Sequence, residues 1–128
     1  MKNTTKILGK FPNSYTYTKN LGERLLLNRK GKIPLCLVRP SIINPSYSEP
    51  FPGWTDSVAA ASAVFLLSGL GVIKSGRLDL NNVGDIIPVD IVSSAIIVVT
   101  AYNMNQTTLP ILQVGTSHLN PLTWQMMK

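Results

Sequence analysis

The run "IPLCLVRP", residues 33–40, is apolar from Leu35 to Val38 and does not alternate with polar residues. A strand with one solvent face alternates, whereas a strand covered on both faces does not, and such strands are typical of parallel sheets. Pro40 ends the run because proline has no amide to donate to a ladder. This run therefore predicts an α/β protein built on a parallel sheet.

A helix is expected before this strand. Residues 14–32, "SYTYTKNLGERLLLNRKGK", have leucines at 21, 25 and 26 with charged residues between them, which is the spacing of an amphipathic helix. Pro12, Asn13 and Ser14 supply start signals and Gly31 supplies a stop signal.

After the strand, the irregular prolines of residues 41–54 predict a loop that leaves the carboxyl end of the strand, where ligands of open α/β sheets bind. The remaining elements are expected in this order: a helix from Thr55 to about Ile73, a short strand in "DIIPVD" (85–90), a helix over 89–103, a strand in "PILQVGT" (110–116) and a first helical turn in "NPLTWQMMK" (120–128).

Composition limits the classes of function. An apolar content of 45% is enough for a folded core, and the charge balance is basic, with 12 Lys plus Arg against 6 Asp plus Glu. The densest basic group, at positions 24, 29, 30 and 32, fits the solvated end of a helix better than a nucleic-acid surface, so no nucleic-acid partner is expected. The single cysteine, Cys36, excludes a disulfide or a Cys-based metal site within the chain, and no metal site is expected.

Two apolar segments, residues 57–73 and 86–102, raise the question of a membrane. A spanning helix needs roughly 20 predominantly apolar residues. The first segment is shorter and contains Gly69 and Gly71, and the second contains Pro88 and Asp90. Both fit buried helices of an α/β protein better, while peripheral contact with a membrane stays open.

One pair of residues points to carbonyl chemistry. Tyr15 and Lys19 are four apart, so on a helix they lie on the same face, whereas the residue four after Tyr17 is Leu21. A free phenol has a pKa near 10, and a nearby ammonium favours the phenolate. Such a tyrosine can give its proton to a carbonyl oxygen as hydride reaches the carbon. A surface pair with a partly packed ring is the alternative.

The order of motifs resembles a family. The stretches "PNSYTYTKNLGERLL", "VRPSII", "EPFPGW", "DIIPVD" and "NPLTW" are similar, in order and spacing, to fatty acyl-CoA reductases of the male-sterility type, in the extended short-chain dehydrogenase/reductase superfamily. The resemblance implies the C-terminal part of a Rossmann-like doubly wound parallel sheet, with residues 1–128 as a partial NAD(P)-binding domain. The Gly-rich βαβ unit that binds the pyrophosphate is missing from the sequence.

The resemblance also implies roles. Tyr15 is the proton donor, and Lys19 is its pKa-lowering partner and binds the cofactor ribose; Pro40, Ser41 and Ile42 lie against the nicotinamide. The expected reaction is the NADPH-dependent reduction of a long-chain fatty acyl-CoA to a fatty alcohol. The family suggests peroxisomal or endoplasmic-reticulum association, and no targeting signal decides between them.

Several questions stay open at this point. Asp85 and Asp90 are as well explained by structure as by function, and Asp90 fits a cap on a helix beginning near Ile91. His118 is expected in a loop. Because the pyrophosphate site is missing, the chain is expected to be a fragment of the reductase that is inactive without an N-terminal half; the alternatives are a non-catalytic remnant that pairs with a full-length reductase and a membrane-associated accessory protein. A half-sheet also predicts an uncovered apolar face.

Overall fold

A computed structural model describes residues 9–58, 60–76, 79–105 and 108–127. Its elements, in chain order, are α2 (Ser14–Arg29), β1 (Leu37–Pro40), β2 (Ile42–Asn44), α3 (Ala60–Gly69), β3 (Ile86–Pro88), α4 (Val89–Asn103), β4 (Ile111–Val114) and the 3-10 helix η1 (Trp124–Met127). β1 pairs with β4 and β2 pairs with β3, both in parallel. The chain is a small α/β fold with parallel strands, consistent with part of a Rossmann-like domain.

Helix α2 begins and ends where the sequence predicts. The Asn13 side chain accepts a hydrogen bond from the Thr16 amide at 2.9 Å and so caps the first turn. Gly31 follows the helix with φ of 56°, in the left-handed region that glycine adopts without a steric penalty. These two signals fix the length of the helix.

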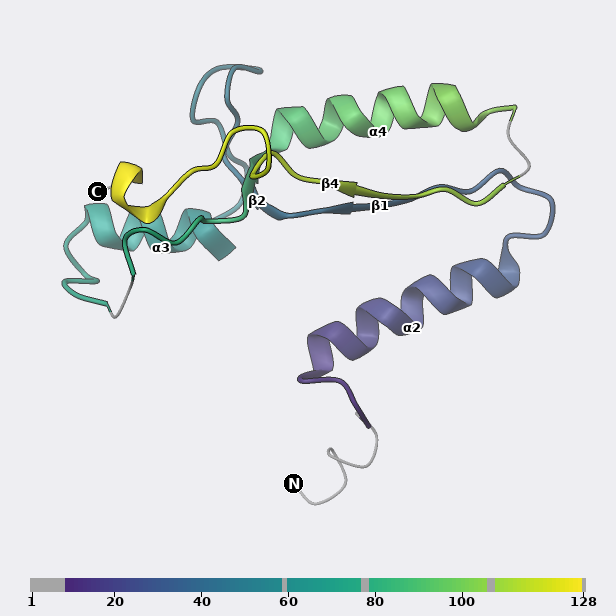
Figure 1. The fold of residues 1–128 in the computed structure, drawn as a ribbon, viewed down its shortest axis with the longest axis horizontal. Helices are drawn as coiled ribbons and strands as arrows, with labels where there is room; N and C mark the ends of the chain where they lie inside the picture. The colour runs from purple at the N-terminus through teal and green to yellow at the C-terminus, as the bar shows by residue number, and fades with distance from the viewer. Residues whose placement is uncertain (1–8, 59, 77–78, 106–107, 128) are drawn as a thin grey trace.

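The expected packing of α2 through its leucines is wrong. Leu21, Leu25 and Leu26 are 41%, 45% and 55% exposed, and no residue of the helix is buried. Figure 1 shows the reason: α2 and α4 lie on opposite sides of the β1–β4 ladder, and α2 stands away from it. The leucine spacing therefore predicts the helix correctly but not its burial.

Two expected boundaries also differ from the structure. Residues 41–54 contain the strand β2 as well as a loop, because the Ile42 amide donates to the Asp85 carbonyl at 3.0 Å and begins the pairing with β3. The helix expected from Thr55 to Ile73 spans only Ala60–Gly69, and the backbone turns left-handed at Gly71. The strand at 86–88, the helix at 89–103 and the last strand are confirmed.

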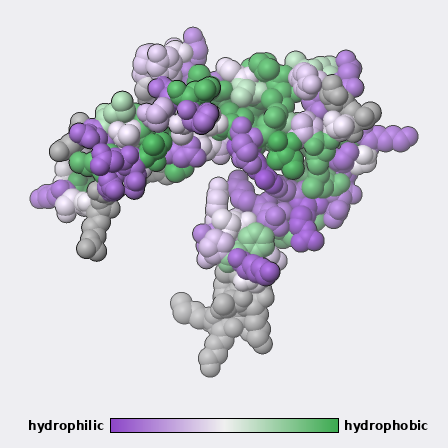
Figure 2. Space-filling model, viewed as in Figure 1, coloured by the Kyte–Doolittle hydropathy of each residue, from purple (hydrophilic) through white to green (hydrophobic). Residues whose placement is uncertain are grey.

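The buried apolar core is small. Its members come from β1, β3 and the first turns of α4, and they are Leu37, Ile86, Ile87 and Val92. Elsewhere large apolar side chains face solvent, among them Ile97 at 69% and Val98 at 66% exposure on α4. Figure 2 shows hydrophobic residues gathered over the α4 side of the molecule and hydrophilic ones over α2. The uncovered apolar face matches the prediction from the sequence.

The two apolar segments contain α3 and most of α4. The expectation that these helices are buried is wrong, since Leu66 of α3 is 47% exposed and Ile97 of α4 is 69% exposed. Within the described residues, no helix combines the length and apolar character that crossing a bilayer requires.

Candidate active site

An open groove of about 1240 Å³ lies between α2, the carboxyl end of β1, β2 and α3. The five predicted site residues all line it: Tyr15, Lys19, Pro40, Ser41 and Ile42. Two of them come from α2, and the other three are the last residue of β1, the first residue of β2 and Ser41 between them. The groove therefore sits where parallel α/β sheets bind their ligands, outside the carboxyl end of a strand.

One face of α2 supplies three of the ionisable groups of the groove. Tyr15, Lys19 and Glu23 follow one another at intervals of four residues and all line it. The Lys19 Nζ lies 5.6 Å from the centre of the Tyr15 ring, within the distance at which an ammonium is attracted to an aromatic face. Tyr15 is 67% exposed, so its phenol is accessible to a ligand.

Tyr17 has a different environment. Its ring packs against Phe11 with the centroids 5.6 Å apart and the planes at 71°, an edge-to-face arrangement, and it does not line the groove. The two tyrosines of the helix thus differ as the four-residue spacing predicts, with one in the groove and one in a local aromatic contact.

Glu23 makes an ion pair with Arg39 of β1. The Arg39 Nε donates to Glu23 Oε1 at 2.9 Å and Nη2 donates to Oε2 at 2.5 Å. The hydrogen bonds from Arg39 lower the pKa of the Glu23 carboxyl, and the charge of Arg39 acts in the same direction. Sequence reasoning missed Glu23, although its place four residues after Lys19 on the same helix face was a usable signal.

Two buried polar atoms line the middle of the groove. The Ser41 Oγ and the Asn44 Oδ1 are shielded from solvent, and neither has a hydrogen-bond partner among the described residues. The Ser41 backbone is held in place, because its amide donates to the Val114 carbonyl at 2.9 Å. A buried polar atom without a partner costs free energy, so both atoms suit a bound ligand with polar groups.

The "PFPGW" motif folds back onto a buried serine. The Ser46 Oγ donates to the Phe51 carbonyl at 2.6 Å and accepts from the Trp54 amide at 3.1 Å. The Ser46 amide donates to the Trp54 carbonyl and the Gly53 amide donates to the Ser46 carbonyl, each at 2.9 Å. These bonds close residues 46–54 into a fixed loop, and its Trp54 end lines the groove.

Asp90 anchors the same loop, and the expected cap on α4 is wrong. Its carboxylate lies in the first turn of the helix but accepts hydrogen bonds from the amides of Tyr47, Ser48 and Glu49 at 2.8–3.1 Å. These amides, that of Tyr47 most of all, hold the pKa of Asp90 far below its usual range. The residue before the helix, Pro88, makes no side-chain cap.

Asp85 also holds two segments together. Its Oδ1 accepts a hydrogen bond from the Ser117 hydroxyl at 2.6 Å, and its carboxylate lines the groove.

His118 lies in the turn after β4, which confirms the prediction of a loop residue. Across the described ranges, no three His, Cys, Asp or Glu side chains gather as metal ligands would.

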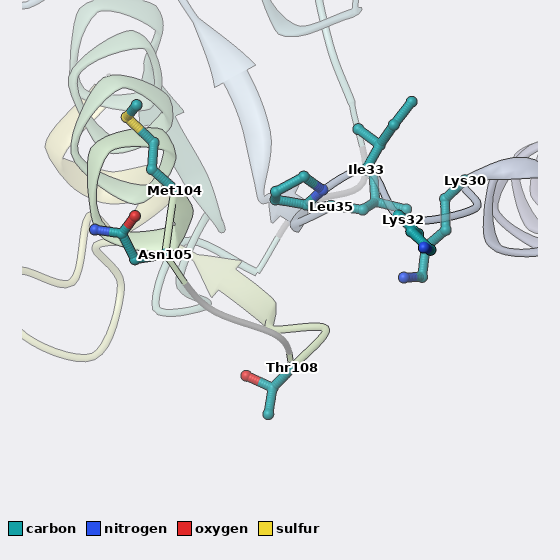
Figure 3. A pocket seen from close by; sticks show the side chains of 8 residues that line it. Lys30, Lys32, Ile33, Leu35, Met104, Asn105 and Thr108 are labelled. Atoms are coloured by element: carbon teal, nitrogen blue, oxygen red, sulfur yellow. The ribbon is translucent and has the colours of Figure 1, made fainter.

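A second pocket of about 440 Å³ lies near the opposite end of β1. Figure 3 shows Lys30 and Lys32 from the segment after α2 on one side and Met104 and Asn105 from the end of α4 on the other. It contains none of the predicted site residues.

The parallel strands and the groove at the carboxyl end of β1 are consistent with part of a Rossmann-like NAD-binding domain. A family model described as male sterility protein, an NAD-binding family, matches residues 1–96 of this chain. The chain therefore belongs to this male sterility family.

The relatives carry reductase names. The chain is 40% identical to "Probable fatty acyl-CoA reductase 5" of Arabidopsis thaliana, over 89% of this chain and 23% of the relative. It is 39% identical to "Fatty acyl-CoA reductase 2" of Mus musculus, over 97% of this chain and 24% of the relative, and 37% identical to "Fatty acyl-CoA reductase 1" of Xenopus laevis, over 94% and 24%. The chain thus spans about a quarter of the length of these relatives.

Proposed function

We propose that this chain is the catalytic part of an NADPH-dependent reductase that converts a long-chain fatty acyl-CoA into a fatty alcohol. The observation that carries the proposal is the meeting of Tyr15 and Lys19 of α2 with the Pro40–Ile42 segment in one groove. A proton donor and a nicotinamide-contacting segment must share one cavity for hydride and proton to reach the same carbonyl.

The proposed reaction has two reductive steps. In the first, the thioester carbonyl carbon accepts a hydride, the C–S bond breaks with its electron pair on sulfur, and CoA leaves as a thiolate that takes a proton from solvent, which leaves the aldehyde. In the second, the aldehyde carbon accepts another hydride and its oxygen takes a proton from the Tyr15 hydroxyl, which gives the alcohol. The ammonium of Lys19, above the face of the Tyr15 ring, stabilises the phenolate that remains until solvent returns the proton.

The groove fits the nicotinamide end of NADPH, which supplies the hydride when bound. Ser41 and Asn44 offer buried polar atoms that lack partners among the described residues, and Lys19 is long enough to reach ribose hydroxyls. The sequence contains no Gly-rich turn for the pyrophosphate. The proposal therefore includes an N-terminal segment, joined to this chain or associated with it, that holds the rest of the cofactor.

The acyl chain is proposed to lie along α3. Val64 and Phe65 of this helix line the groove, and Ile86 of β3 adds a further apolar side chain. An apolar wall beside the proton donor favours a hydrocarbon substrate, because it removes apolar surface from water.

The test is NADPH oxidation with palmitoyl-CoA, measured for this chain fused behind the N-terminal half of a related reductase. Tyr15→Phe is expected to lower turnover by about 10²–10⁴-fold, the usual contribution of a positioned general acid. Tyr17→Phe is the matched control, since its ring contacts Phe11 instead of the groove, and it should retain activity. A Tyr15→Phe variant as active as the Tyr17→Phe variant would contradict the proposal.

A non-catalytic remnant that pairs with a full-length reductase is the second candidate. The exposed apolar residues of α4, such as Ile97 and Val98, favour it because surfaces of this kind mark interaction sites. This candidate predicts that a full-length reductase co-purifies with the chain equally well with Tyr15→Phe, and that no activity of the complex depends on Tyr15.

A further inference from the structure

Few contacts hold α2 in place. None of its residues is buried, and three of its four leucines are 41–55% exposed. Apart from the local cap by Asn13, Glu23 with Arg39 is the one pair of side chains, among the described residues, that forms hydrogen bonds between α2 and the remainder of the fold. The position of the helix relative to β1 therefore depends on that pair and on the connection through residues 30–36.

The geometry of the pair suits this purpose. Arg39 uses two nitrogens and Glu23 uses both carboxylate oxygens, so the planar guanidinium fixes direction as well as distance. The side chains are 43% and 27% exposed, which places the pair among the surface ion pairs, whose effects are modest. A lysine at position 39 could not make the same two parallel bonds.

Arg39 also determines which cation pairs with the Glu23 carboxylate. Glu23 lies four residues after Lys19, so its carboxylate is within reach of the Lys19 ammonium on the same helix face. In the structure the carboxylate pairs with Arg39, and Lys19 lies over the Tyr15 ring. The other charged groups that line the groove are Asp56, before α3, and Asp85, before β3.

We infer that Arg39 is a positioning residue: by binding Glu23 it ties α2 to β1 and keeps the Glu23 carboxylate from competing with Tyr15 for Lys19. The first half of this inference stands on the structure alone. The second half rests on the proposed function, because it concerns the proton donor.

The first test is hydrogen exchange of the full chain, followed by mass spectrometry on peptides from α2 and from residues 86–92. Arg39→Ala is expected to speed exchange in α2 by about two- to fivefold, the range for an exposed ion pair, without changing residues 86–92. Arg24→Ala is the control, since Arg24 is an exposed cation of α2 without an ion pair in the described structure. The charge-swapped double variant Glu23→Arg with Arg39→Glu should restore slow exchange.

Three results would contradict the inference that Arg39 ties α2 to β1. They are equal exchange in the Arg39→Ala and Arg24→Ala variants, a charge swap that does not restore protection, and α2 amides that already exchange fully in the unchanged chain. None of these measurements uses reductase activity. The exchange data can therefore be interpreted even if the proposed function is wrong.

The second test is the pH profile of turnover in the fused reductase. Arg39→Ala should lower turnover and move the alkaline limb upward by a fraction of a pH unit, because the freed carboxylate disfavours the phenolate. Combining Glu23→Gln with Arg39→Ala removes the carboxylate. The alkaline limb of the pH profile should then return to its position in the unchanged protein, although α2 stays loosely held. A limb that does not move in Arg39→Ala contradicts the electrostatic half of the inference.

Discussion

The groove has two sides that are held in very different ways. One side is lined by Trp54, the end of a segment here called the loop wall, which is residues 46–54 with Asp90. Hydrogen bonds inside the loop wall and to α4 fix its backbone. The other side is α2, which has no buried residue and one ion pair to β1. The proposed proton donor sits on the loosely held side.

This contrast has a physical meaning. Elements with few buried contacts open at lower free energy than elements of the core, and parts of a site that must adjust to ligands are drawn from them. Tyr15 on α2 can therefore approach a substrate by movement of a whole helix, while Ser41 and Trp54 keep their positions on the fixed side.

The largest effect is expected at the centre of the core. Ile87 is completely buried, so Ile87→Ala should lower the free energy of unfolding by about 2–5 kcal/mol through lost burial and the cavity left behind. Ile97→Ala is the control, because Ile97 is 69% exposed and its truncation should change stability by at most about 0.5 kcal/mol. Urea unfolding of the full chain measures both; equal losses would show that α4 is covered on its outer face.

Removing the hydroxyl that closes the loop wall should have a smaller effect. Ser46 is 5% exposed, and Ser46→Ala leaves the Phe51 carbonyl and the Trp54 amide without their side-chain partner. The Trp54 amide still donates to the Phe51 carbonyl at 3.2 Å, so the expected loss is that of the side-chain hydrogen bonds alone, about 0.5–1.5 kcal/mol each. The exposed Ser57 is the control site for the same substitution. Faster hydrogen exchange in residues 46–54 should accompany the loss, and unchanged exchange would contradict the account of the loop.

Asp90 should make the stability depend on pH. The pKa of its carboxyl is lowered in the folded chain by the amides of Tyr47, Ser48 and Glu49, so its contribution is complete above the ordinary value of 3.8. The contribution is lost as the pH falls below that value and the carboxylate is protonated. The difference in urea midpoint between the unchanged chain and Asp90→Asn should be constant at neutral pH and shrink below about pH 4. A difference that persists undiminished in acid would mean that the charge is not the cause.

Much of the fold could be predicted from local patterns. The Asn13 and Gly31 signals bound α2, and the unalternating run before Pro40 predicts β1, because capping and backbone geometry act over a few residues. The burial of the α2 leucines could not be predicted, since helical spacing says which residues share a face and not what covers that face. β2 was missed because its short ladder depends on β3, more than forty residues later.

The site divides in the same way. Tyr15 and Lys19 could be found from their spacing, and Pro40–Ile42 from the family resemblance, and the structure brings them into one groove. The partner of Asp90 could not be found, because its carboxylate binds amides some 41–43 residues away. Such contacts depend on the tertiary packing of the loop against α4. They cannot be predicted from the residues next to Asp90 in the sequence.

The most direct test of the central claim is single-turnover reduction of a long-chain aldehyde by the fused reductase with NADPH bound in advance. This step needs one hydride and one proton, so it isolates the role of Tyr15 from thioester cleavage. The account predicts a loss of about 10²–10⁴-fold for Tyr15→Phe and almost none for Tyr17→Phe. Aldehyde reduction that proceeds equally well in both variants would show that Tyr15 does not supply the proton.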